Sequence, residues 1–174
     1  SLLATVLLPT PYSLVSTPYW LAPMDPLNDG RQSQAALDIR RGAARCLLAH
    51  GFAHACEVTL ATSRRADILA IHDNGEIWIV EIKSSLADFR ADQKWRDYRV
   101  DCDRLFFAVA PDFPREVLPE DAGMIIADRY GAEILRPAPE HRMTAARRKA
   151  VTLRFGRLSA LRLHALADPE LGLE

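Results

Sequence analysis

The sequence lacks a marked excess of charge of either sign. Its 174 residues include 22 Lys and Arg and 23 Asp and Glu, which gives a formal net charge of −1 at pH 7. This balance excludes a polycation that coats nucleic acid indiscriminately, so any contact with nucleic acid must come from a local basic surface. A chain of this length is typical of a single domain with a substantial core.

Cysteine is also scarce, and several common site motifs are missing. The three cysteines, Cys46, Cys56 and Cys102, are widely spaced and lack the paired spacing of a zinc site. They favour buried thiols in a reducing compartment, and we expect a cytoplasmic protein. The five histidines are scattered, and the chain has no Gly-rich phosphate loop, no Ser-His-Asp order and no internal repeat.

No uninterrupted apolar run is long enough to cross a membrane. Residues 1–23 are apolar and nearly free of charge, but proline interrupts them repeatedly, and they lack the basic region of a secretory signal. Met24 opens a polar stretch typical of the start of a cytoplasmic protein. We therefore expect residues 1–23 to be a loosely ordered or non-native extension and residues 24–174 to form a single domain without a membrane span. An anchoring or partner-binding segment at 1–23 is the alternative.

The stretch from Arg64 to Lys83 joins two apolar strands that carry charges where a core strand normally has none. The apolar character of RADILAI and EIWIVEIK indicates burial on both faces. Because side chains alternate along a strand, Asp67 lies on one face of the first, and Glu81 and Lys83 share one face of the second.

The turn between these strands decides whether the charged groups meet. A three-residue loop of Asp73, Asn74 and left-handed Gly75 would place Asp67 opposite Glu81, with their Cβ atoms roughly 5 Å apart. A two-residue Asn-Gly turn would instead shift the register by one residue and send the acids to opposite faces. A shared site therefore requires the three-residue loop.

Two carboxylates this close raise each other's pKa and destabilise the fold unless a cation neutralises them. Oxygen ligands suit Mg²⁺ or Mn²⁺, and an adjacent ammonium can hold a water or a phosphate. The pattern of Asp67, Glu81 and Lys83 therefore predicts metal-dependent phosphodiester hydrolysis. The alternative is that Glu81 and Lys83 form a solvated pair at a strand end, with Asp67 capping a loop.

The residues RRADILAI followed by VEIKSS resemble the PD-(D/E)XK nuclease superfamily. The continuation DFRADQKWRDYRVDCDRLFFAVAP resembles the MmcB family of proposed bacterial DNA-repair endonucleases within that superfamily. The resemblance runs from about Gln32 to Pro169. Ala66 stands where the superfamily name has proline, which is a common departure.

The resemblance implies a role for each residue of the motif. Asp67 and Glu81 would bind Mg²⁺ or Mn²⁺, with the Ile82 backbone carbonyl as a third ligand, and Lys83 would be the catalytic lysine. The implied activity is that of a DNA-repair endonuclease in the bacterial cytoplasm. A catalytically inactive module that binds DNA or is recruited by a partner, and a purely structural interaction protein, are the competing classes.

Charged residues on the neighbouring segments are further candidates. Glu57, near the start of the expected strand HACEVTL, is either another metal ligand or the counter-charge of Arg64 or Arg65. These two arginines precede Asp67, with Ala66 between them and it, and are candidates to hold its carboxylate or a DNA phosphate.

A helix is expected after Lys83. Ser85, with an acidic residue three positions later, predicts its start, and the pattern continues through LADFRADQKWRDYRV. On such a helix Arg90, Lys94 and Tyr98 occupy neighbouring positions and would flank the site, with Arg90 and Lys94 as candidate DNA contacts. Trp95 is expected to pack in the core rather than to stack on a base.

The remaining segments complete an α/β order. A helix over 32–50, the three antiparallel strands, the helix after Lys83 and the strand RLFFAVAP give a restriction-endonuclease-like core, with C-terminal helices after Pro139. GMIIAD and AEILRP add two smaller strands at one edge. On the first helix, Arg40, Arg41 and Arg45 either approach phosphate or form a solvated face.

The C-terminal region is basic, with an apolar stripe expected to dock on the sheet. Arg147, Arg148 and Lys149 are a candidate DNA patch or a solubilising surface. DNA is the expected partner, other repair proteins are further candidates, and pairing of two copies is open. The apolar stripe consists of Leu153, Phe155, Leu158, Leu161 and Leu163.

Overall fold

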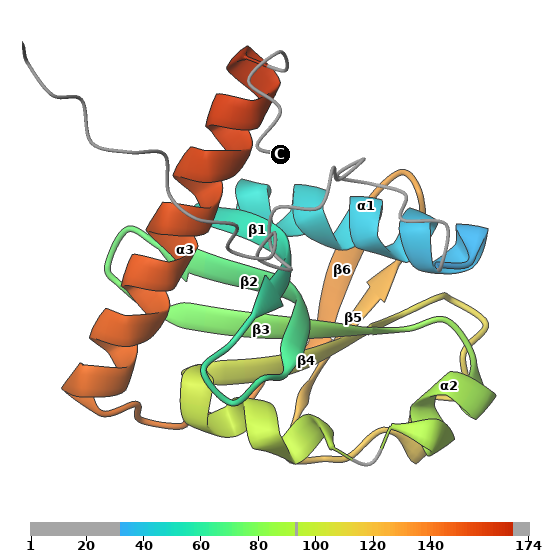
Figure 1. The fold of residues 1–174 in the computed structure, drawn as a ribbon. Helices are drawn as coiled ribbons and strands as arrows, with labels where there is room; N and C mark the ends of the chain where they lie inside the picture. Colours follow the sequence, from blue (N-terminus) through green and yellow to red (C-terminus); the bar gives the residue numbers. More distant parts are fainter. Residues whose placement is uncertain (1–31, 93, 169–174) are drawn as a thin grey trace, which may run out of the picture.

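The structure, a computed structural model, describes residues 32–92 and 94–168. The expected extension at 1–23 and the acidic tail after Asp168 lie outside the described residues. The described chain forms a six-stranded sheet with helices packed against it (Figure 1). The strands are β1 (Phe52–Thr59), β2 (Arg65–His72), β3 (Ile77–Lys83), β4 (Arg104–Val109), β5 (Gly123–Ala127) and β6 (Ala132–Arg136), and the helices are α1 (Gln34–Ala49), α2 (Leu86–Ala91), α3 (Ala145–Ala167) and the 3₁₀ helices η2 (Trp95–Asp101) and η3 (Arg115–Val117).

The strands lie in the sheet in chain order. β1, β2 and β3 are antiparallel neighbours, β4 runs parallel to β3, β5 runs parallel to β4, and β6 returns antiparallel at the edge. The expected α/β core of a helix, three antiparallel strands, a helix and a strand is therefore confirmed, as are the two smaller strands at one edge. None of the helices in the described part of the chain has the length and apolarity needed to span a bilayer.

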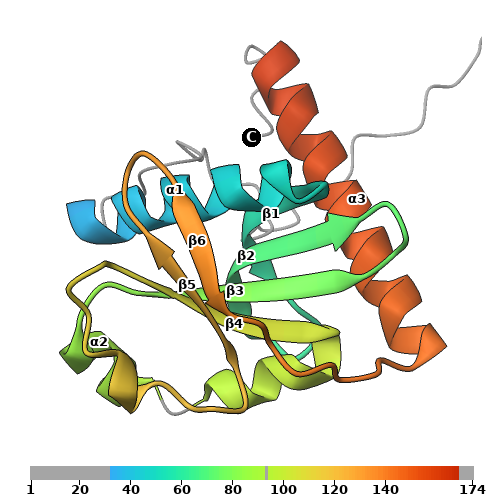
Figure 2. The same cartoon turned by 180° about the vertical axis from the view of Figure 1, so that it is seen from behind.

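Each face of the sheet has its own apolar core. On one face, Ile39 and Leu47 of α1 pack with Ile68, Val80 and Phe106. On the other face, the side chains of η2 and α3 cover the sheet. Figure 2 shows the arrangement from behind. Because both faces are covered, the central strands are apolar on both sides, as expected from their composition.

The close approach of α1 to the sheet depends on Gly42. A Cβ atom on this residue would stand only 2.1 Å from the backbone oxygen of Asp128 and 2.3 Å from that of Gly131. The helix therefore rests directly on the turn between β5 and β6. At its start, the hydroxyl of Ser33 accepts a hydrogen bond from the Ala36 N–H at 3.2 Å and caps the helix.

The single helix expected after Lys83 is wrong. Ser85 does cap α2, but this helix ends at Ala91, and Asp92 is extended, with φ −98° and ψ 93°. The chain resumes as the 3₁₀ helix η2, so Arg90, Lys94 and Tyr98 do not share one helical face. At this break the side chain of Asp92 binds Lys83 of β3.

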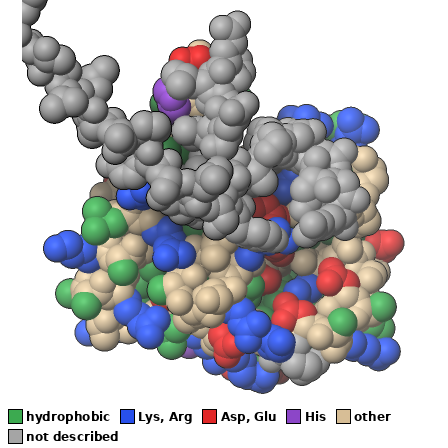
Figure 3. Space-filling view, in the orientation of Figure 1, with side chains coloured by type: hydrophobic (Ala, Val, Ile, Leu, Met, Phe, Trp, Pro, Cys, Tyr) green, Lys and Arg blue, Asp and Glu red, His purple; other side chains and the backbone are tan. Residues whose placement is uncertain are grey.

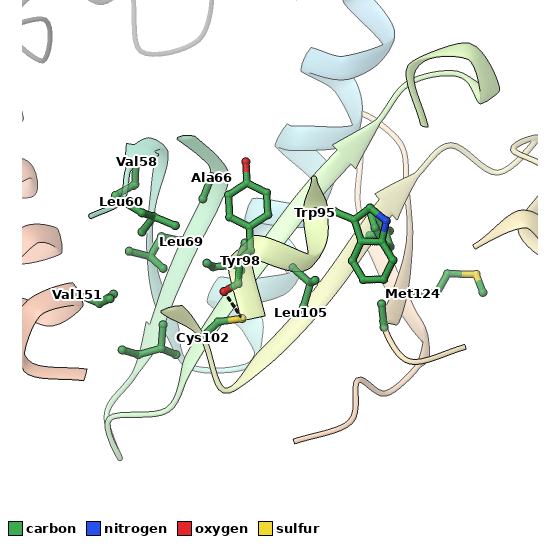
Figure 4. Close-up of a cluster of buried hydrophobic side chains, with 14 of the residues drawn as sticks. Val58, Leu60, Ala66, Leu69, Trp95, Tyr98, Cys102, Leu105, Met124 and Val151 are labelled. Carbon is green, nitrogen blue, oxygen red and sulfur yellow. Dashed lines mark hydrogen bonds between the residues drawn. The ribbon is translucent and has the colours of Figure 1, made fainter. Parts of the chain in front are cut away.

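Trp95, by contrast, packs as expected. It is buried at the start of η2, on the core face shown in Figure 4, with its ring edge-on to Phe107 at 5.4 Å between centroids. Stacking of this side chain on a base is therefore excluded.

The C-terminal region forms one helix in the described part of the chain, α3, rather than several. Val151 is buried, and Phe155 and Leu158 pack against the core, but Leu153 and Leu163 are 63% and 67% exposed. The predicted apolar stripe is therefore wrong for these two leucines. The C-terminal half of α3, which carries Leu163, extends past the sheet (Figures 1 and 2), whereas Leu153 lies in the N-terminal half with its side chain exposed to solvent.

Arginines of α3 bind the edge strand β1. Arg154 donates a hydrogen bond to the Thr59 carbonyl at 2.5 Å, and Arg162 donates to the Cys56 carbonyl at 2.6 Å. These contacts occupy backbone acceptors that an edge strand would otherwise leave open.

Among the cysteines, Cys46 and Cys102 are buried and Cys56 is half-buried, and all three are free thiols.

Candidate active site

The turn between β2 and β3 is the three-residue loop that a shared site requires. The N–H of His72 donates to the Glu76 carbonyl and the N–H of Gly75 to the His72 carbonyl, both at 2.9 Å. Gly75 has φ +84°, the left-handed conformation that glycine adopts without strain. Pairing runs from Ile71 opposite Ile77 to Ile68 opposite Val80, and the same register continued by one pair sets Asp67 against Glu81. The predicted register is confirmed.

The carboxylates of Asp67 and Glu81 lie where β2 and β3 stop pairing. Asp67 Oδ2 accepts a hydrogen bond from the Ile82 N–H at 2.7 Å, and the Asp67 N–H donates to Glu81 Oε1 at 3.3 Å. Side-chain oxygens thus take the place of ladder carbonyls at this gap. Because the N–H and C=O of a strand residue point to the same side, the Ile82 carbonyl faces this gap as well.

Burial raises the pKa of both acids. The pKa of Asp67 rises to about 6, mainly through desolvation; the hydrogen bond from Ile82 opposes the rise and the charge of Glu57 adds to it. The pKa of Glu81 is raised well above its ordinary range by burial and then by the negative charge of Asp67. The pair therefore destabilises the cation-free fold when both groups are ionised, and it favours the arrival of positive charge.

Lys83 is on the same face of β3 as Glu81 and is only 4% exposed. Its Nζ donates to Asp92 Oδ2 at 2.6 Å. Although burial acts to lower the pKa of Lys83, the bond to Asp92 and the charge of Glu81 raise it above the ordinary value, so the lysine is charged at neutral pH. Asp92 was not among the residues expected at the site, because a continuous helix would have placed it on a solvated turn.

Tyr98 lies at the same site. Its hydroxyl donates to the Arg65 carbonyl at 2.8 Å, and Figure 4 shows its ring next to Ala66. Burial raises its pKa strongly, and the charges of Glu81 and Asp67 raise it further. The phenol therefore stays neutral and lies within the field of both acids. Tyr98 was expected to flank the site from a continuous helix, but it reaches this position from η2.

Glu57 lies toward the end of β1, because the strand begins at Phe52, and not near the start as expected. Its φ is +53°, unusual for a residue other than glycine. Its carboxylate lies 2.6 Å from Arg65 Nε and 3.8 Å from Arg40, and it accepts a hydrogen bond from Gln32 at 2.5 Å. This is the arrangement expected of a counter-charge. A role for Glu57 as a metal ligand stays a prediction.

The basic residues expected to touch DNA are distributed between the site and α3. Arg64 pairs with Asp97 at 2.8 Å and Arg65 pairs with Glu57, so both have acidic partners, and the charge of Arg65 acts on Asp67. Arg90 and Lys94 are exposed on the segment that follows Lys83. On the face shown in Figure 3, Lys and Arg side chains form separate small groups.

The other arginines mostly make internal contacts. Arg147 pairs with Asp101 at 3.0 Å and Arg148 with Asp103 at 2.6 Å, so both dock α3, whereas Lys149 is exposed. On α1, Arg40 is buried. Both predictions for this residue, an approach to phosphate and a place on a solvated face, are therefore wrong. Arg45 donates to the carbonyls of Arg129 and Tyr130 at 3.1 and 2.9 Å.

The donor set at the gap suits a hard divalent cation. Among residues 32–92 and 94–168, no group of three or more His, Cys, Asp and Glu side chains is arranged to hold a metal. Two carboxylates and a carbonyl are nevertheless sufficient for Mg²⁺ or Mn²⁺, since such ions usually keep several waters and take one or two carboxylates.

Comparison with known proteins gives one family model and one solved structure that are similar to this chain. The family model described as DNA repair protein MmcB-like matches residues 23–170. The solved structure of the SPO1766 protein of unknown function from Silicibacter pomeroyi is 47% identical, with a TM-score of 0.77. That match covers 80% of this chain and 96% of the other. No curated protein matches the chain significantly.

Proposed function

The chain belongs to the MmcB-like family of DNA repair proteins, and from this premise we propose that it is a metal-dependent endonuclease of the PD-(D/E)XK type that hydrolyses phosphodiester bonds in DNA. One observation carries the proposal: Asp67, Glu81 and Lys83 meet on one face of β2 and β3, and the latter two are buried. A binding module has no need of two buried acids, because burying them together destabilises the fold.

The acids are the groups that would hold the cation. Asp67 and Glu81 supply carboxylate oxygens, and the Ile82 carbonyl faces the same gap. When bound, Mg²⁺ or Mn²⁺ stabilises negative charge on a phosphoryl oxygen and lowers the pKa of water. The hydrogen bond from the Ile82 N–H fixes one oxygen of Asp67 and leaves the other for the cation.

The basic residues handle the substrate's negative charge. Lys83, charged and buried beside Glu81, holds the scissile phosphate or the attacking water by hydrogen bonding. Arg64 and Arg65 precede Asp67 by three and two residues and can exchange their acidic partners for neighbouring DNA phosphates. Burial of the lysine and Glu81 limits access of bulk water, which strengthens each of these interactions.

The proposal is tested by incubating the protein with supercoiled, single-stranded and branched DNA in Mg²⁺ or Mn²⁺. Wild type should cut at least one substrate, and Asp67→Asn and Lys83→Gln should each lose more than about a hundredfold in rate. The matched control is Asp73→Asn, because Asp73 lies in the same hairpin with a side chain that is 89% exposed. This control should cut like wild type.

The outcomes separate the competing classes. If wild type binds DNA but cuts none of the substrates, the non-catalytic DNA-binding module replaces the nuclease. An interaction protein would show no DNA affinity at low salt. It would also give no Mn²⁺ heat in calorimetry above that of the Asp67→Asn, Glu81→Gln double variant.

A further inference from the structure

Asp92 makes contacts that the proposed function leaves without a role. Its Oδ2 accepts the hydrogen bond from Lys83 Nζ at 2.6 Å, and its Oδ1 accepts one from the Lys94 N–H at 3.0 Å. The residue lies in the extended break between α2 and η2 and is partly shielded from solvent. A carboxylate held at both oxygens and directed at a buried lysine is well fixed in place.

The alternative partner for the lysine is Glu81. The two residues share a face of β3, two positions apart, which corresponds to roughly 7 Å along a strand. A lysine side chain can fold back over that distance. In the structure, however, Lys83 Nζ forms its ion pair with Asp92. Without Asp92, a buried ammonium would turn to the nearest remaining carboxylate, because an unpaired buried charge is strongly unfavourable.

We propose that Asp92 is a positioning residue that holds the Lys83 ammonium away from Glu81. Both carboxylates of the gap then remain available to the cation. This inference rests on the proposed function and deepens it. The extended conformation at Asp92 is needed for this role, because in a continuous helix the side chain would point away from Lys83.

The test compares Asp92→Asn, which removes the charge and keeps the shape, with Asp92→Glu, which keeps the charge. Asp92→Asn should lower the turnover number for DNA cleavage about 10- to 100-fold, as is typical when a supporting partner of a metal site is lost. The KM for DNA should stay within about threefold, since this acid does not touch substrate. Asp92→Glu should recover part of the lost turnover.

Two readouts do not depend on cleavage. Calorimetry should show weaker Mn²⁺ binding in Asp92→Asn, because the lysine then competes for Glu81. The chain has three lysines, Lys83, Lys94 and Lys149. In protein labelled with ¹⁵N-lysine, the buried Lys83 ammonium signal should therefore be assignable, and it should shift in Asp92→Asn while the Lys149 signal stays in place.

The matched control is Asp121→Asn, which removes an ion pair between an exposed acid and Arg99 of η2. It should leave turnover, Mn²⁺ affinity and the Lys83 signal unchanged. If wild type cleaves DNA and Asp92→Asn turns over like wild type, the positioning role is refuted and the nuclease stands. Equal losses in Asp92→Asn and Asp121→Asn refute it too. If wild type neither cleaves DNA nor binds Mn²⁺, the proposed function fails and the positioning role fails with it.

Discussion

Arg148 and Asp103 form a two-point ion pair that fixes the hairpin on which the candidate site depends. Arg148 binds both oxygens of Asp103, at 2.6 and 2.7 Å, and also donates to the Gly75 carbonyl at 2.6 Å. Asp103 in turn accepts the Ile77 N–H at 2.8 Å. The turn, the first residue of β3 and α3 are thereby joined at one place. The contact therefore holds the turn whose type sets Asp67 against Glu81.

Loss of this ion pair should therefore destabilise the fold. Arg148→Ala leaves Asp103 and the Gly75 carbonyl without their partner, and we expect a loss of about 2–4 kcal/mol in the free energy of unfolding, measured by urea denaturation. The neighbouring Lys149→Ala should stay within about 0.5 kcal/mol of wild type. If Lys149 contacts DNA, the same variant should reduce the slope of log affinity against log salt by about 1. An unchanged slope would remove Lys149 from the DNA surface.

The two buried glutamates should respond in opposite directions to the same substitution. Glu81→Gln removes a charge that repels Asp67 and keeps an oxygen to accept the Asp67 N–H, so the free energy of unfolding should rise by about 1–3 kcal/mol at pH 8 while cleavage is lost. Glu57→Gln leaves buried Arg40 with a weaker partner, so this variant should lower the free energy of unfolding by about 2–4 kcal/mol. Chemical denaturation of both variants at one pH shows whether each substitution raises or lowers the free energy of unfolding. A loss of stability in Glu81→Gln would contradict the strained acid pair.

The pH dependence of stability follows from the raised pKa of Asp67. An acid whose folded pKa lies above its unfolded value binds more protons in the native state, so stability falls as pH rises through that interval. For Asp67 the interval runs from 3.8 to about 6. Without divalent cation, wild type should lose on the order of 2–3 kcal/mol relative to Asp67→Asn across this range. The measurement is the difference between their unfolding free energies at a series of pH values.

Asp103 provides the control of opposite sign. Although burial acts to raise its pKa, the bonds from Arg148 and Ile77 hold it below its usual range. Its stabilising contribution is present above the unfolded pKa and disappears as pH falls. Relative to Asp103→Asn, wild type should therefore lose stability on acidification. For Asp67, the opposite test applies. If the unfolding free energies of wild type and Asp67→Asn change with pH in parallel, the pKa of Asp67 is not raised in the folded state.

Added cation should stabilise the native state through the same acids. At a Mn²⁺ concentration tenfold above the dissociation constant, binding contributes about 1.4 kcal/mol, which raises the melting temperature of a domain of this size by about 3–6 °C. Glu81→Gln should show no such rise, and Asp73→Asn should show all of it. Differential scanning calorimetry with and without Mn²⁺ makes the comparison. An equal rise in all three proteins would mean that the ion binds elsewhere.

Much of the fold and the centre of the candidate site follow from local patterns in the sequence. Asp73, Asn74 and Gly75 specify a loop type, the loop specifies a register, and the register places Asp67 against Glu81 without any long-range information. Strand order was likewise predictable, because apolar runs separated by turn signals leave few arrangements. Local chemistry therefore determined the part of the site that lies on one hairpin.

The parts that could not be predicted depend on contacts between distant segments. At the break, Asp92 binds the side chain of Lys83, nine residues earlier, and helical propensity carries no signal for that contact. Arg147 and Arg148 were expected to contact DNA because they are basic, but their acidic partners lie more than forty residues away, at Asp101 and Asp103. Burial of Arg40 against Glu57 is of the same kind.

The turn itself gives the last test, through one substitution made at two glycines. Neither Gly75 nor Gly156 has an atom within 4 Å of where a Cβ would stand, so sterics with neighbours do not distinguish them. Gly75 has φ +84°, a conformation that alanine adopts only at a cost of about 1–2 kcal/mol, so Gly75→Ala should lower the free energy of unfolding by that amount. Gly156 lies within α3, where alanine is favoured by about 0.8–1 kcal/mol, so Gly156→Ala should raise it. Urea denaturation measures both changes, and a neutral Gly75→Ala would mean that residue 75 does not need the left-handed conformation, which would remove the support for the three-residue loop.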